Sequence, residues 1–308
     1  MTRTAKTVTA VNHAQIDTAQ SKFGGASGLF DGTDDYLSIP DSADWAFGTG
    51  NFTIDFWVRF NTLPASDAYP AFYTQDVDAS NHISFGIYNV AGTQSLYFQW
   101  RTAGTYGLNM LRATTVTTGV WYHLAAVHSG GNEGYAYIFQ DGQQVGSTGS
   151  VTAGPPDLAI EVNIGKRVSS SHYFNGWLDE FRVSKGVARW TSNFTPPTAP
   201  HTPDSYDVLL LPMDGADTST TFLDCPCAVE GTINDRLTGT AISGATVELF
   251  KSSDLTHVGA VAGSPYTSES TGRYIFRVSD PAIAYFVRAF KNGSPNLFGV
   301  TDDNLVGA

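Results

Sequence analysis

Cysteine is scarce in this chain, and its two copies, Cys225 and Cys227, are separated by a single proline. A disulfide across one intervening residue would be strained, and two thiols alone cannot complete a zinc site. We therefore interpret both as reduced thiols without a role. Packing, rather than disulfide bonding, is expected to hold the domains together.

Long apolar runs and basic clusters are also missing. No segment has the ~20 apolar residues that a membrane-spanning helix needs, and residues 1–10 have no apolar core of signal-peptide length. The chain has 17 Lys and Arg against 29 Asp and Glu, a net charge of −12, and lacks a basic patch that could neutralise phosphates. We expect no signal peptide, no membrane insertion and no nucleic-acid partner.

Helical periodicity is absent as well, and strand periodicity takes its place. Between Phe52 and Phe60 every second residue is apolar, and the same alternation is found at Ile83–Ile87 and Leu96–Trp100. Residues 135–145 form a hairpin pattern around Asp141-Gly142, because Asp-Gly supplies the positive φ angles of a tight primed turn. An all-β chain is predicted.

The hydrophobic content of 42%, with 13% aromatic residues, is enough for well-packed cores. Single cores stop growing well below 308 residues, so two or more domains are expected. Length and composition do not locate the domain boundaries, so we infer them from motifs.

Four phrases, each a turn that leads into a strand, are spaced over the first 185 residues. They are FDGTDDYLSIP (30–40), FTIDFWVRF (52–60), WYHLAAVH (121–128) and GWLDEFRV (176–183). Together they resemble the concanavalin A-like jelly roll of the laminin-G-like type. The resemblance implies a jelly-roll sandwich over residues 1–224 that acts as a binding or structural module.

A proline-rich strap at 195–205 interrupts this region, with four prolines from Pro196 to Pro203 that favour extended backbone. An apolar strand follows within 206–224. In jelly rolls of phage tail proteins a similar phrase stands before the first strand. We therefore expect 206–224 either to return to its own domain, as in a circular permutant, or to be donated to a neighbouring copy. It could otherwise simply start the second module.

The second module is assigned to residues 228–308. Its turn glycines and alternating strands, at 231–239, 242–249 and 267–276, resemble the carboxypeptidase regulatory-like domain. That resemblance implies a small Ig/transthyretin-like β-sandwich, which is non-catalytic in that family.

Motifs of catalysis are absent: there is no Gly-x-Ser-x-Gly elbow, no His-Glu-x-x-His and no phosphate-binding glycine loop. Asp179 and Glu180 occupy adjacent strand positions, so their side chains are expected to point to opposite faces. They would then be unable to flank a glycosidic bond as the two carboxylates of a glycosidase do. We expect no enzymatic activity.

The resemblance also implies a structural calcium ion near the acidic residue of the last-strand phrase. Asp179, Asp214 and Asp31 are the candidate ligands, and Asp214 is included because its segment should pair nearby. The alternative is that Asp179 and Glu180 satisfy loop amides and arginine partners.

A candidate ligand surface is the outward face of three strands, provided that they neighbour each other in one sheet. This face combines aromatic and polar side chains, namely Asp55, Trp57, Arg59, Tyr88, Tyr97, Gln99 and Arg101. The alternative is that a crossing loop or a second protein covers Trp57, since large aromatic residues are mostly buried.

The runs 184–197 and 300–308 resemble segments of tailed-phage virion proteins. The resemblance implies a structural and adhesion component at the tail, a fibre or the capsid surface, assembled in the host cytoplasm with other virion proteins. Binding of a host-surface glycan by a homo-oligomer, with a trimer favoured, would add avidity. The alternative is a bacterial carbohydrate-binding module exported by a non-classical route.

Overall fold

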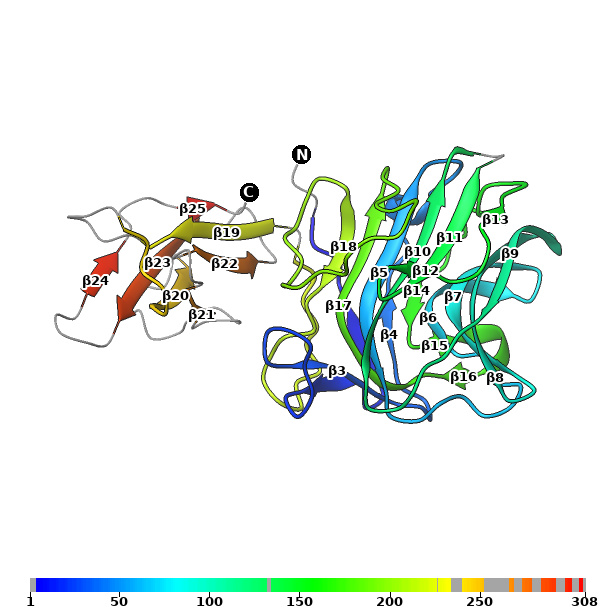
Figure 1. Cartoon of the computed structure of the whole chain (residues 1–308), viewed down its shortest axis with the longest axis horizontal. Helices are drawn as coiled ribbons and strands as arrows, with labels where there is room; N and C mark the ends of the chain where they lie inside the picture. Colours follow the sequence, from blue (N-terminus) through cyan, green and yellow to red (C-terminus); the bar gives the residue numbers. More distant parts are fainter. Residues whose placement is uncertain are drawn as a thin grey trace. The chain divides into compact units, whose positions relative to one another are not determined.

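The computed structural model describes residues 4–131, 134–225, 227–233, 240–251, 266–268, 273–278, 284–291, 297–300 and 305–306. The chain divides into two compact units (Figure 1). The first comprises Lys6–His201 and Tyr206–Asp224, and the second comprises Met1–Ala5, Thr202–Ser205 and Cys225–Ala308. No α-helix is found among the described residues, so none has the length and apolarity that a membrane crossing requires. The all-β prediction is confirmed.

The first unit is a jelly-roll sandwich of two large antiparallel sheets. The seven-stranded sheet has the order β1 (Thr9–Val11), β4 (Tyr36–Ile39), β14 (Val162–Ile164), β6 (Ala71–Asp78), β7 (Asn81–Val90), β8 (Thr93–Thr102) and β9 (Thr105–Ala113). The nine-stranded sheet has the order β12 (Gln143–Gln144), β11 (Tyr135–Gln140), β10 (Trp121–Ser129), β5 (Phe52–Phe60), β17 (Asn175–Lys185), β3 (Ser27–Asp31) and β2 (Gln15–Asp17). In addition, β13 (Gly149–Ser150) pairs with β11 and β18 (Asp207–Leu211) pairs with β17.

Shorter elements connect these sheets. They are the 3-10 turns η1 (Ala43–Trp45) and η3 (Val168–Ser170) and the ribbon of β15 (Lys166–Arg167) with β16 (His172–Tyr173). The turn between β11 and β12 has φ angles of 49° at Asp141 and 74° at Gly142, as its sequence predicts.

The core lies between the two sheets and is rich in phenylalanine. From β5, Phe52, Phe56 and Phe60 are fully buried and meet side chains of the other sheet such as Phe85 and Phe98. Burial of one such side chain stabilises the fold by about 1.5–3 kcal/mol. The alternation predicted for β5 therefore places its apolar residues in the core, and its polar residues on the outer face.

Segment 206–224 pairs within its own chain. β18 runs antiparallel to β17, with Leu211 opposite Phe181 and Leu209 opposite Val183. Leu209, Leu210 and Leu211 are fully buried. The carboxylate of Asp224 accepts hydrogen bonds from the backbone N–H groups of Leu210 and Lys6, at 2.9 and 2.7 Å. Figure 1 shows β18 beside β17, where it fills the edge that β3 leaves open.

The outer face of the nine-stranded sheet is covered by the chain that follows β17. Trp190 and Phe194 stack on each other at 4.0 Å and pack against Ala125, Val127 and Phe139 of β10 and β11. This cover makes part of the outer face, over β10 and β11, a second and smaller apolar layer.

The second unit is also built of antiparallel strands where it is described. β19 (Cys227–Thr232) pairs with β22 (Arg273–Val278), while β20 (Thr246–Lys251), β21 (Tyr266–Thr267), β23 (Ala284–Lys291), β24 (Leu297–Val300) and β25 (Leu305–Val306) form a second sheet. Val247 and Leu249 are buried, as their alternation predicts. The predicted turns at 234–239 and 269–272, and most of the C-terminal phrase 300–308, lie outside the described residues.

Candidate functional site

The seven residues predicted to share one ligand surface lie on different sheets. Asp55, Trp57 and Arg59 belong to β5 of the nine-stranded sheet, whereas Tyr88 on β7 and three residues of β8, Tyr97, Gln99 and Arg101, belong to the other sheet. The expectation of a common sheet is therefore wrong. Alternation tells which side of its own strand a residue faces, but not which strands pair, and the outer faces of a sandwich point away from each other.

Trp57 is covered. Its side chain is 5% exposed, the Lys22 ammonium lies 3.8 Å from the ring centroid, and the rings of Phe23 and His123 pack edge-on at 6.0 and 5.2 Å. This arrangement corresponds to the covered alternative and not to an open platform. Arg59, by contrast, packs 5.1 Å from the Trp177 ring.

Asp55 is the centre of a buried ionic cluster. Its two oxygens accept hydrogen bonds from Nε and Nη2 of Arg182, both at 2.9 Å, and Nε2 of His201 and of His123 lie 3.2 and 3.4 Å away. Burial raises the pKa of Asp55, but Arg182 and His201 outweigh it and hold the pKa well below its ordinary value. The carboxylate and two imidazoles resemble a metal site in composition. Because the Arg182 guanidinium occupies both oxygens of the Asp55 carboxylate, the cluster is an internal ion pair rather than a metal site.

A β-bulge changes the geometry expected for Asp179 and Glu180. On β17, Asp179 pairs with Trp57 and Arg182 with Asp55, so two residues oppose the single Phe56 of β5. Glu180 has a φ of 53°, which such a bulge accommodates. Its carboxylate accepts the backbone N–H of His201 in the strap at 2.6 Å. The bulge thus turns Glu180 toward the strap-covered outer face, and the predicted opposite orientation of Asp179 and Glu180 is wrong.

Asp179 and Asp214 lie close together, and Asp31 does not join them. Asp179 is fully buried and accepts backbone N–H bonds from Lys22 and Phe23 at 2.7 and 3.1 Å. Burial, then Glu180 and also Asp214, raise the pKa of Asp179 well above its usual value. Asp31 pairs with Asn175 at the far end of β17 and bonds its own turn.

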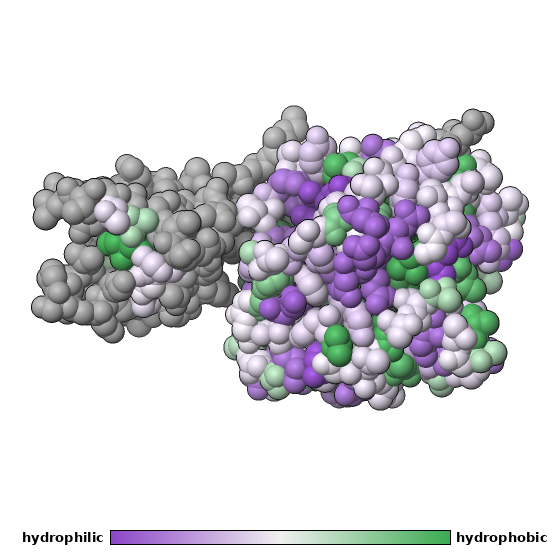
Figure 2. Space-filling model, in the orientation of Figure 1, coloured by the Kyte–Doolittle hydropathy of each residue, from purple (hydrophilic) through white to green (hydrophobic). Residues whose placement is uncertain are grey.

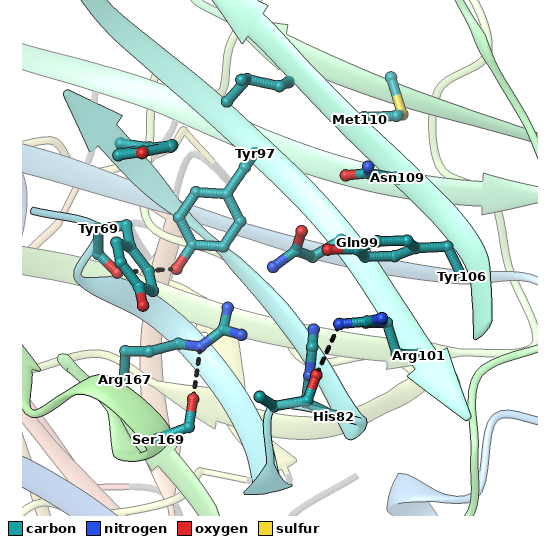
Figure 3. Close-up of a pocket in the computed structure, with 13 residues that line it drawn as sticks. Tyr69, His82, Tyr97, Gln99, Arg101, Tyr106, Asn109, Met110, Arg167 and Ser169 are labelled. Carbon is teal, nitrogen blue, oxygen red and sulfur yellow. Dashed lines mark hydrogen bonds between the residues drawn. The ribbon is translucent and has the colours of Figure 1, made fainter. Parts of the chain in front are cut away.

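A cavity with polar walls lies on the outer side of the seven-stranded sheet and has a volume of about 430 Å³. Its lining residues come from β7, β8, β9, β15, η3 and nearby loops (Figure 3), and four of the predicted residues are among them, namely Tyr88, Tyr97, Gln99 and Arg101. Figure 2 shows hydrophilic and hydrophobic residues interspersed over one face of this unit.

Tyr97 forms the floor of the pocket. Its side chain is 3% exposed, and its hydroxyl lies 3.2 Å from the carbonyl oxygens of Tyr69 and Pro70. The opposite residue on β7 is Gly86, where a Cβ would lie 2.5 Å from the Tyr97 hydroxyl and 2.3 Å from the Pro70 oxygen. Glycine is therefore required at this position for the ring to lie flat across the strands.

The pocket presents an aromatic ring and two side-chain amides to a ligand. Tyr106 on β9 is 38% exposed, and its ring lies 4.4 Å from the guanidinium carbon of Arg101. Gln99 and Asn109 face each other on β8 and β9, and within the described part of the chain neither amide has a hydrogen-bond partner. An aromatic ring beside two amides can stack on an apolar face and bond hydroxyl groups at the same time.

Arg167 lines the remaining side of the pocket, and the sequence patterns did not predict that position. Arg167 of β15 is 4% exposed, and its Nε lies 3.0 Å from the Asp76 carboxylate. Nearby His82 is 1% exposed, and burial, followed by Arg167, lowers its pKa to about 4, so the imidazole is neutral at pH 7. Tyr69, Asp76 and Arg167 come from loops and strands distant in sequence. Tyr106 could have been found by extending the β8 alternation across the Ala103-Gly104 turn, whereas the register shift between Trp100 and Arg101 places Asn109 out of that alternation.

Known proteins resemble this chain mainly in its fold. No curated protein matches it. Domain 4 of AbnA, a GH43 extracellular arabinanase from Geobacillus stearothermophilus, was solved with arabinotriose and is 16% identical, with a TM-score of 0.43 over 59% of this chain and 83% of that one. Tailspike protein 2 of Escherichia coli O157:H7 bacteriophage CAB120 is 13% identical, with a TM-score of 0.43 over 61% of this chain and 26% of the tailspike.

The binding domain of Paraclostridial Mosquitocidal Protein 1 is 11% identical, with a TM-score of 0.47 over 98% of this chain and 68% of that domain. A family model described as the concanavalin A-like lectin/glucanases superfamily matches residues 31–191, which is more than half of the 308 residues. The matched range contains the whole pocket. The chain therefore belongs to the concanavalin A-like lectin/glucanases superfamily, in its laminin-G-like branch.

Proposed function

We propose that the chain is a non-catalytic glycan-binding adhesion protein and that the pocket on the seven-stranded sheet is its binding site. The observation that carries this proposal is the combination of exposed Tyr106 with the free amides of Gln99 and Asn109. A pyranose ring has an apolar face for the tyrosine and hydroxyl groups for the amides. Among the described lining residues there is no aspartate or glutamate, whereas glycoside hydrolysis normally uses two carboxylates.

Tyr106→Ala tests this site. The substitution removes the aromatic face and is expected to weaken saccharide binding about tenfold, which corresponds to roughly 1.4 kcal/mol. The matched control is Tyr135→Ala, which removes a tyrosine that is 55% exposed on β11 of the other sheet. Binding can be measured on an array of bacterial surface polysaccharides. Equal binding by Tyr106→Ala and the unaltered chain, with loss in Tyr135→Ala, would move the site to the other sheet.

We propose further that the adhesion protein is carried on the surface of a tailed-phage virion as a homo-oligomer, with a trimer favoured. The proposal is supported by the resemblance of residues 184–197 to phage-associated laminin-G-like proteins and by the gain in avidity that several weak sites provide. Residues 228–308 would then act as a transthyretin-like spacer or dock. Images of a purified phage particle that lack this chain would favour the alternative, a bacterial carbohydrate-binding module.

A structural calcium ion beside Asp179 is a separate proposal. Asp179 is buried, and its Oδ1 has no hydrogen-bond partner among the described residues, while Glu180 and Asp214 add negative charge nearby. The carboxylates of Asp179 and Asp214 offer the hard oxygen atoms that calcium prefers, whereas the Glu180 carboxylate already accepts the N–H of His201. Asp31 lies apart and is not included. Bound calcium would neutralise a group whose charge is otherwise costly to bury.

Asp179→Asn distinguishes the ion from a simple buried acid. With a chelator present, the variant is expected to melt at a higher temperature than the unaltered chain, because it removes a buried charge yet can still accept the Lys22 and Phe23 N–H bonds. Added calcium should raise the melting temperature of the unaltered chain and leave that of Asp179→Asn unchanged. An identical calcium response in both proteins, or none in either, would contradict the proposal.

A further inference from the structure

The pocket has the opposite charge from the chain as a whole. The chain carries a net charge of −12, whereas the thirteen residues that line the pocket include two arginines and, among those described, no acidic residue. Asp76 is not among the lining residues, and its carboxylate compensates the positive charge of Arg167. Asp78 lies in the adjoining turn, where its carboxylate accepts N–H bonds from Ser80 and Asn81. Both charged side chains in the pocket lining are therefore cationic, and the two aspartates lie outside that lining.

Arg101 supplies one of the two cationic groups. Its Nη1 donates to the carbonyl oxygen of Ala79 at 3.0 Å, and its Nε donates to that of Gly104 at 3.1 Å. These partners are neutral, so they fix the guanidinium against the turns without cancelling its charge. The charge therefore lies beside the Tyr106 ring at one end of the pocket.

Arg167 supplies the second cationic group of the pocket, and one of its N–H donors has no acceptor in the described part of the chain. Its Nε lies 3.0 Å from the Asp76 carboxylate and donates to the Ser169 hydroxyl at 3.4 Å, but its Nη1 is buried and has no hydrogen-bond partner among the described residues. Figure 3 shows this guanidinium directed toward the space between Tyr97 and Gln99. A buried cationic donor without an acceptor is costly, and a carboxylate is the acceptor that best matches the planar guanidinium.

We propose that the natural ligand is an acidic saccharide, whose carboxylate bonds Arg167 while its ring and hydroxyl groups contact Tyr106, Gln99 and Asn109. This inference rests on the proposed function, because it names the class of glycan that the same pocket selects. The preference comes from the fork-shaped contact with Arg167 and from attraction to Arg101, whose hydrogen-bond partners are neutral. A neutral glycan of the same shape would leave the Arg167 donor without an acceptor.

Matched saccharide pairs test the proposal without altering the protein. The full-length chain is titrated calorimetrically with oligogalacturonide and with its carboxyl-reduced form, and likewise with hyaluronan oligosaccharide and its carboxyl-reduced form. The acidic member of at least one pair is expected to bind about tenfold more tightly than its reduced counterpart. Equal or tighter binding by the reduced members would overturn the inference and leave the proposed function intact. Absence of binding by every member, acidic and neutral, would count against both.

Arg167→Lys identifies the residue responsible. Lysine keeps a positive charge next to Asp76 but lacks the planar fork, so the preference for the acidic over the reduced member should fall to about threefold or less. The preference is a ratio within one protein, so partial unfolding of the variant would not change it. Arg59→Lys, on the other sheet, is the matched control and should keep the full preference. An unchanged preference in Arg167→Lys would overturn the assignment.

Discussion

Replacing Asp55 by alanine is expected to lower the free energy of unfolding by about 3–5 kcal/mol, the range seen when one partner of a buried ion pair is removed. Arg182 is 6% exposed and bonds both oxygens of Asp55, so the variant would leave its guanidinium buried beside two imidazoles. Urea denaturation followed by tryptophan fluorescence measures this loss.

Asp157→Ala is the control for that experiment. Asp157 is exposed, and its replacement is expected to change the stability by no more than about 0.5 kcal/mol. A double substitution, Asp55→Leu with Arg182→Met, should recover most of the loss because it removes both charges together. If Asp55→Ala were no more destabilising than Asp157→Ala, the cluster would not hold the strap and the sheet together.

Deleting residues 206–224 is expected to cause the largest defect of all. The deletion removes Leu209, Leu210 and Leu211, and full burial of each contributes about 1.5–3 kcal/mol. It also exposes the edge of β17 from Phe181 to Ser184, and an unpaired edge is a template for association with another chain. Light scattering and thermal melting should show aggregation and loss of the cooperative transition.

A synthetic peptide of residues 206–224 separates the edge effect from general damage. Added in excess to the deleted chain during refolding, it should restore a soluble protein, since β18 is held by pairing and packing that do not require a covalent link. A deleted chain that stayed monomeric with an unchanged melting temperature would show that β18 is dispensable.

Local pattern was enough to predict the strands but not their partners. The alternation at Phe52–Phe60 gave the bounds of β5 and its buried face, and Asp141-Gly142 gave the hairpin turn. Both depend on neighbours in sequence. Whether β5 lies beside β8 depends on contacts between residues far apart in the chain, and no periodicity encodes them.

The candidate site was predicted in part for the same reason. Four pocket residues were identified because they alternate outward on β7 and β8, whereas Arg167, on β15, is brought to the pocket by contacts between segments far apart in the chain. The bulge at Glu180 was not predicted because a single residue with positive φ does not change the alternation of apolar and polar residues in the sequence. The sequence left Trp57 either exposed on a ligand surface or covered, and it could not show the cover because residues 22 and 23 are remote in sequence.

The location of a bound saccharide is the most direct test of the central claim, that the outer side of the seven-stranded sheet is the ligand-binding surface. A crystal structure of the full-length chain, soaked with the tightest-binding oligosaccharide, would locate it. We expect a sugar ring against Tyr106, with hydroxyl groups within hydrogen-bond distance of Gln99 and Asn109. A sugar bound on the outer face of the nine-stranded sheet, or on residues 228–308, with the pocket empty, would contradict the account.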